Sequence, residues 1–175
     1  MPSVSHLLHL VRRFVGSLRP GGPSGADEAW VARILSPEEI RLWRRMRGDD
    51  RRHAVGVARR TGQALGPRAT RAVLAAALLH DVGKIDSGFG PVRRAVATVA
   101  GLVWGHATAT GWRTRRGFVG RTGRYLSHDA IGADMLTAAG SDGLTVTWAR
   151  EHHLSPERWS LPVDVGAALK LADDD

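Results

Sequence analysis

The stretch Ala77-Leu78-Leu79-His80-Asp81-Val82-Gly83-Lys84 carries the strongest structural signal in this 175-residue chain. It closes an almost continuous apolar run that begins at Ala72, and an Ala-rich run of this length is typical of a buried helix rather than a strand. A charged Asp beside a His at the end of such a helix is costly to bury unless another charge compensates it. A divalent cation would compensate it. The stretch therefore predicts a buried helix that ends at a metal site.

Helical signals continue on both sides of this stretch. Upstream, we expect a segment over 26–35, a helix that Ser36-Pro37 caps and that runs to about Gly48, and a helix over 50–65. Downstream, helices are expected over 91–104, 128–139, 144–153 and 162–172. The Gly-, Thr- and Arg-rich stretch 105–123 is expected to be a loop or an insertion. No segment alternates with period 2 for long enough to predict a sheet, so the predicted fold class is all-α.

The N-terminal part predicts a separate appendage. Apolar residues fall on one helical stripe at Leu7, Leu10, Val11, Phe14 and Leu18, and a Gly- and Pro-rich linker follows at 20–25. We therefore expect residues 1–25 to be an amphipathic helix with its linker, and residues 26–175 to be the folded domain. The helix either packs on that domain or contacts a membrane surface or a partner helix through residues 4–18. Because Arg12 and Arg13 lie inside the apolar run, it does not resemble a secretory signal, and a cytoplasmic location is expected.

Composition limits the chemistry. The chain has no Cys, which excludes disulfide scaffolds, thiol catalysis and iron–sulfur clusters, so any metal must be held by His and carboxylates. The 25 basic residues against 17 acidic ones give a formal charge of +8, which favours anionic partners such as nucleotides, nucleic acid or acidic lipid.

Histidines mark the ends or inner faces of the predicted helices. One His on an apolar helix is usually an ordinary core residue, but several on separate helices, together with an Asp dyad and a terminal Asp cluster at 173–175, favour a metal site. The five histidines concerned are His53, His80, His128, His152 and His153.

In this order the motifs resemble those of the HD-domain metal-dependent phosphohydrolases, in the branch with a His-Asp-x-Gly-Lys turn. The resemblance covers residues 45–174, the part of the chain that bears the motifs. It rests on His53 within 51–58, the His80-Asp81 dyad, His128 within 127–133, the His152-His153 pair, and Asp173 after Ala172.

The resemblance implies a single all-helical HD domain that holds one or two divalent ions. One ion is implied at His53, His80, Asp81 and Asp173. A second ion is implied at Asp81 as a bridge, His128, and either His152 or His153. Asp81 and Lys84 are the expected catalytic residues, with Lys84 one helical turn after His80 and placed to meet a substrate phosphate. The metal stays open among Fe, Mn, Zn, Mg and Co.

Departures from two better-known branches narrow the substrate. Alarmone hydrolases carry a Glu-Asp pair where this chain has Lys84 and Ile85, and cyclic-dinucleotide phosphodiesterases carry a Glu where this chain has Leu154. The expected activity is hydrolysis of a phosphoester or phosphoanhydride bond in a nucleotide or related substrate by a metal-activated water. An HD-type ribonuclease is the enzymatic alternative.

A non-catalytic HD-fold module is the alternative from another class. It would bind nucleic acid or a signalling partner through the Arg runs at 41–60 and 111–124, where Trp112, Phe118 and Tyr125 are interleaved with the second run. Helical-core positions favour a structural role for Trp43, Trp104 and Trp148. The oligomeric state stays open.

Overall fold

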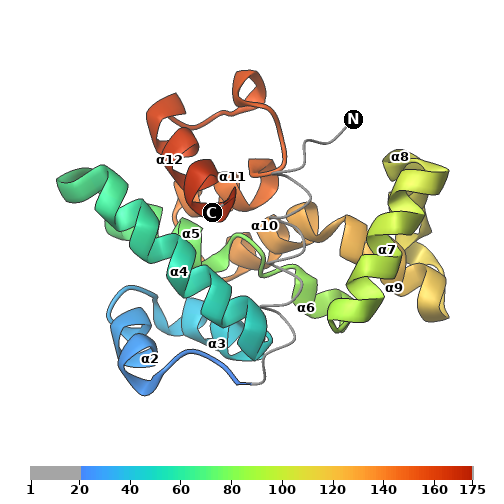
Figure 1. The fold of residues 1–175 in the computed structure, drawn as a ribbon, viewed down its shortest axis with the longest axis horizontal. Coiled ribbons are helices and arrows are strands. Elements are labelled where there is room, and N and C mark those ends of the chain that lie inside the picture. The colour runs from blue at the N-terminus through green and yellow to red at the C-terminus, as the bar shows by residue number, and fades with distance from the viewer. Residues whose placement is uncertain (1–20, 175) are drawn as a thin grey trace.

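In the computed structural model, the described part of the chain is residues 21–174, without the side chains of His106 and Ala107. Every regular element in this part is helical, which confirms the all-α prediction (Figure 1). The predicted helix and membrane contact at 4–18 lie outside the described residues. The α-helices are α2 (Gly25–Ala32), α3 (Pro37–Arg45), α4 (Gly48–Leu65), α5 (Arg71–Leu79), α6 (Lys84–Ser87), α7 (Pro91–Trp104), α8 (His106–Thr110), α9 (Gly117–Leu126), α10 (His128–Ala138), α11 (Gly143–Glu151) and α12 (Val163–Asp174).

The apolar helix α5 forms the centre of the core. Its residues from Ala75 to Leu79 are buried, and α4 and α11 pack against it. Helix α12 packs on α4, and α10 packs on α11. This arrangement places the end of α5, where the His-Asp dyad begins, beside helices that are far away in the sequence.

The stretch 105–123 is mostly helical and not the loop that is one of the two predictions for it, while its interpretation as an insertion stays a prediction. It contains α8, a 3-10 turn at Gly111–Thr114 and the first part of α9. Its glycines serve packing. A Cβ on Gly120 would lie 1.7 Å from the Arg115 carbonyl oxygen, and a Cβ on Gly123 would lie 2.4 Å from the Arg113 nitrogen. Glycine here permits close approach of two backbone segments, which sequence patterns do not distinguish from a flexible turn.

The sequence predicts a structural role in the core for three tryptophans, and two of them lie there. Trp43 and Trp148 lie in the core, whereas Trp104 is 59% exposed at the end of α7. Among the described residues, no helix combines the length and the apolar character that a membrane span requires.

Candidate metal centre

The His-Asp dyad lies where α5 ends. His80 follows the last residue of that helix, and both His80 and Asp81 are buried. The dyad therefore presents an imidazole and a carboxylate to the interior of the helical fold.

One cluster gathers His53 of α4, His80 and Asp173 of α12. Their ligand atoms lie within 4.8 Å of one another. His53 Nε2 is 2.9 Å from Asp173 Oδ1, and His80 Nε2 is 3.5 Å from the same oxygen. The Arg60 guanidinium donates to the Ala172 carbonyl oxygen at 2.7 and 3.0 Å, which anchors α12 to α4 beside Asp173. We refer to these three residues as the first cluster.

A second cluster gathers His128, His152 and His153, again within 4.8 Å of one another. His128 begins α10, and the other two follow α11. His128 Nε2 is 3.1 Å from His153 Nε2. The geometry excludes neither His152 nor His153 as a ligand, because both lie within reach of an ion shared with His128.

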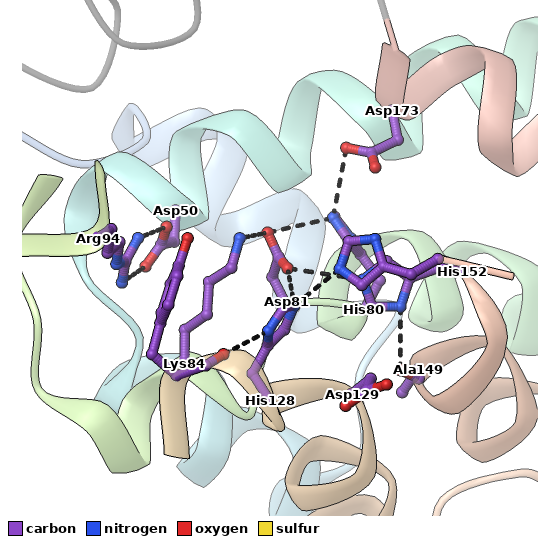
Figure 2. Close-up of polar contacts among 12 residues, drawn as sticks. Asp50, His80, Asp81, Lys84, Arg94, His128, Asp129, Ala149, His152 and Asp173 are labelled. Carbon is purple, nitrogen blue, oxygen red and sulfur yellow. Dashed lines mark hydrogen bonds and ion pairs between the residues drawn. The ribbon is translucent and has the colours of Figure 1, made fainter. Parts of the chain in front are cut away.

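Asp81 lies between the two clusters (Figure 2). Its Oδ2 is 3.4 Å from His80 Nε2, while its Oδ1 is 3.3 Å from His128 Nε2 and 3.8 Å from His152 Nε2. Lys84 forms an ion pair with Oδ2. Each carboxylate oxygen thus faces a different cluster, which is the geometry that a bridging ligand needs.

Backbone carbonyls fix the tautomers of three histidines. The Nδ1–H groups of His80, His128 and His152 donate to the carbonyl oxygens of Ala77, Tyr125 and Ala149 at 2.9, 2.8 and 3.0 Å. A carbonyl only accepts, so Nδ1 carries a proton and Nε2 is left to bind an ion, as in protein metal sites generally.

Two of these Nε2 atoms test whether a metal fits. In the part of the chain that the structure describes, the buried Nε2 atoms of His80 and His152 form no hydrogen bond, and the nearest carboxylate oxygens lie 3.4–3.8 Å away. Buried polar atoms are seldom left unpaired. Both atoms point at the region of Asp81, and the donor set of imidazole nitrogen and carboxylate oxygen suits borderline divalent metals. The residues fit a divalent ion.

The electrostatics favour the ligand forms of most groups. Burial opposes ionisation of Asp81, but Lys84 and His80 outweigh it and hold the pKa of Asp81 well below its usual value. Burial holds the pKa of His152 well below its usual value, and burial together with His128 lowers the pKa of His153 to about 3. An ionised carboxylate and neutral imidazoles are the forms that bind metal.

His80 differs. Burial disfavours its charged form, but the combined attraction of the Asp81 and Asp173 carboxylates raises the pKa of His80 to about 10. Together with the Lys84 ammonium, a proton on His80 would balance the buried carboxylates, so a cation is not their only compensation. A metal that binds at the first cluster must displace this proton.

Two glycines bring the second cluster to the dyad. A Cβ on Gly83 would lie 2.0 Å from the His128 carbonyl oxygen and 2.6 Å from the Gly132 nitrogen. A Cβ on Gly132 would lie 3.0 Å from the Gly83 nitrogen. The turn after Asp81 therefore touches the first turn of α10 backbone to backbone, which places His128 beside Asp81.

Sequence reasoning missed a charged pair beside Lys84. Arg94 of α7 donates to both carboxylate oxygens of Asp50 in α4, at 2.5 and 2.7 Å, and both side chains are largely buried. Figure 2 shows this pair on the Lys84 side of Asp81. The Tyr125 ring also stacks on His128, with centroids 5.8 Å apart. The Arg93-Arg94 dipeptide gives no sign of which Arg turns inward, so no sequence signal identifies the pair.

The family model of the HD domain matches residues 51–174 of the chain. No curated protein and no solved structure matches it.

Proposed function

Because the chain belongs to the HD domain family, we propose that it is a metal-dependent phosphohydrolase that cleaves a phosphoester or phosphoanhydride bond of a nucleotide or a related compound. The observation that carries the proposal is the position of Asp81, with Oδ2 at 3.4 Å from His80 and Oδ1 at 3.3 Å from His128. This carboxylate links two clusters that can each hold an ion.

The proposed ligands of one ion are His53, His80, Asp81 and Asp173, and those of a second are Asp81, His128 and His152 or His153. Divalent ions bound there would polarise a phosphoryl oxygen and lower the pKa of a bound water. Asp81 itself contributes the negative charge that balances two cations. The Nδ1 hydrogen bonds of His80, His128 and His152 hold those rings in place, so little reorientation is needed before the reaction.

Lys84 is the proposed contact for the substrate phosphate. Its ammonium lies on Asp81, and burial would lower its pKa, but Asp81 outweighs burial and raises it. Lys84 therefore stays charged at neutral pH. Cations bound to Asp81 would weaken its pull on Lys84, which leaves the ammonium available to a phosphate oxygen.

The net charge of +8 supports an anionic substrate and does not choose among nucleotides. The activity would operate in the cytoplasm. The distinguishing experiment measures hydrolysis of nucleoside phosphates, dinucleoside polyphosphates and short RNAs with Mn, Fe, Co, Zn or Mg. RNA cleavage without nucleotide hydrolysis would favour the ribonuclease alternative.

Asp81→Ala tests whether this site performs the chemistry. We expect hydrolysis to fall by about three orders of magnitude or more, the scale seen when a group that acts as part of a catalytic unit is removed. The matched control is Asp134→Ala, because Asp134 also forms an ion pair, with Arg150, but is exposed on α10 and belongs to neither cluster. Equal activity in both variants would place the chemistry elsewhere. A parent protein without bound metal and without hydrolysis of any substrate would support the non-catalytic module.

A further inference from the structure

Helix α7 exposes its large apolar residues to solvent, whereas a helix of a globular domain usually buries them against the core. The residues that face the body are small: Ala97 and Gly101 are buried, and a Cβ on Gly101 would lie 3.2 Å from a methyl group of Leu126 in α9. The large residues are exposed instead, at Val92, Val96, Val99, Leu102, Val103 and Trp104. An exposed apolar face of this kind marks a site of interaction.

The apolar stripe runs along one helix. Val92, Val96, Val99 and Val103 follow the spacing of four, three and four that aligns side chains on one face. Phe118 and Val119 at the start of α9 are exposed as well. Helices α7, α8 and α9 contact one another and lie together at one side of the molecule (Figure 1). We call this group of helices, residues 91–126, the α7–α9 unit.

The charge of the same region is entirely positive. The sequence from Ser87 to His128 contains seven Arg and no Asp or Glu. Of these, Arg93, Arg113, Arg115 and Arg116 are exposed. A partner must therefore accept aliphatic side chains and also carry negative charge.

We propose that the α7–α9 unit docks on an anionic lipid surface. A helix with Val, Leu and Trp on its outer face and Arg beside it is suited to lie in the plane of the interface, with its apolar face among the acyl chains and Arg at the phosphates. Trp104 and Trp112 lie at one end of the stripe, with ring centroids 5.9 Å apart, and tryptophan favours the level of the headgroups.

Charge disfavours two other partners for the exposed face of the α7–α9 unit, a second copy of the chain and the chain's own N-terminal segment. A second copy docked through the same face would bring two all-positive segments together. The chain's own residues 1–20 contain three Arg and no acidic residue, so the same repulsion applies to them. Nucleic acid would satisfy the Arg side chains, but it offers no apolar surface to cover four Val residues and Leu102.

Vesicle flotation of the full chain tests the proposal, with phosphatidylcholine vesicles prepared with and without phosphatidylglycerol. We expect binding to the anionic vesicles only, weakened by salt because part of the attraction is electrostatic. Leu102→Glu should weaken binding at least tenfold, since it removes one buried apolar side chain and adds a charge that anionic lipid repels. The matched control is Val163→Glu on α12, where an equally charged substitution replaces another exposed apolar residue and should leave binding unchanged.

Two further variants separate the contributions. Arg113→Gln/Arg115→Gln/Arg116→Gln should weaken binding at least tenfold and reduce its dependence on salt. Phe14→Glu tests residues 4–18 in the full chain. If Phe14→Glu abolishes vesicle binding and Leu102→Glu does not, the N-terminal segment carries the contact and the proposal is wrong.

A spectroscopic readout avoids relying on loss of binding. The chain has no Cys, so Leu102→Cys and Val163→Cys each provide a single attachment point for an environment-sensitive dye. We expect anionic vesicles to shift the emission to shorter wavelength at position 102 and not at 163. An unchanged spectrum at 102, a dimer that Leu102→Glu dissociates in the absence of lipid, or binding to RNA without binding to vesicles would each overturn the proposal.

Discussion

Asp81 Oδ1 and His128 Nε2 lie 3.3 Å apart, and the proposed second ion depends on this pair. The His128 ring stands between Tyr125 and His153. His128→Ala is expected to lower bound metal from two ions per chain to one, measured by elemental analysis, while the fold is retained. The loss of one hydrogen bond to the Tyr125 carbonyl should cost about 1 kcal/mol of unfolding free energy. One ion in the parent would make the site mononuclear, and two ions in both proteins would make His128 a core or substrate residue rather than a ligand.

The structure favours His152 over His153 as a metal ligand, although both residues lie near His128. His152 is fully buried, and its Nδ1 donates to the Ala149 carbonyl oxygen, whereas His153 is the more exposed of the two, although its ring is partly buried against His128. A ring that is held in place loses less freedom on binding an ion, so His152 is the stronger candidate ligand. We expect His152→Gln to weaken metal affinity at least tenfold more than His153→Gln, measured by titration calorimetry. The reverse order would assign the ligand to His153.

Among the elements, the turn from Gly83 into α6 and the start of α10 depend on each other. A Cβ on Gly83 would meet the His128 carbonyl oxygen at 2.0 Å, and backbone cannot move aside as a flexible side chain can. Gly83→Ala should therefore destabilise the fold by about 1–3 kcal/mol, measured by urea denaturation. It should also weaken metal binding, because α10 must shift away from Asp81.

Gly62→Ala is the matched control for that substitution. Gly62 lies inside α4, and a Cβ there would only touch Leu74 at an ordinary 3.6 Å. Replacing a helical glycine with alanine should stabilise the protein by about 0.5–1 kcal/mol. If Gly83→Ala is as harmless as Gly62→Ala, the close contact between the two segments is not needed for the fold.

Elements with strong local signals could be predicted, and elements defined by packing could not. Ser36 accepts from the Glu39 N–H while Glu39 accepts from the Ser36 N–H, so the start of α3 is encoded locally. The glycines of α9 mislead sequence-based prediction. Gly120 and Gly123 resemble turn signals, but they lie in a helix and are required because neighbouring backbone leaves no room for a Cβ. How the preceding 3-10 turn folds back on α9 decides the role of these glycines, and sequence periodicity does not indicate it.

The same division applies to the site as a whole. The residue types and order of His53, the dyad, His128 and Asp173 indicate a metal site, and the structure brings all of them together. The sequence does not predict the buried pair of Asp50 and Arg94, because the two residues lie 44 positions apart. Buried ion pairs need exact mutual placement, which composition and spacing do not supply.

For the whole molecule, a metal that joins α4, α5, α10 and α12 should stabilise the folded chain. A ligand that binds only the folded state at about 100 times its dissociation constant adds about 2.7 kcal/mol. For a chain of this size that corresponds to a rise in Tm of about 5–10 °C. We expect Mn²⁺ or another suitable ion to raise Tm by this amount and a chelator to reverse it, measured by differential scanning fluorimetry. His53→Ala/His128→Ala removes one residue from each cluster and should abolish the shift, whereas Asp134→Ala should retain it. An equal shift in both variants would mean that the ion binds outside the two clusters.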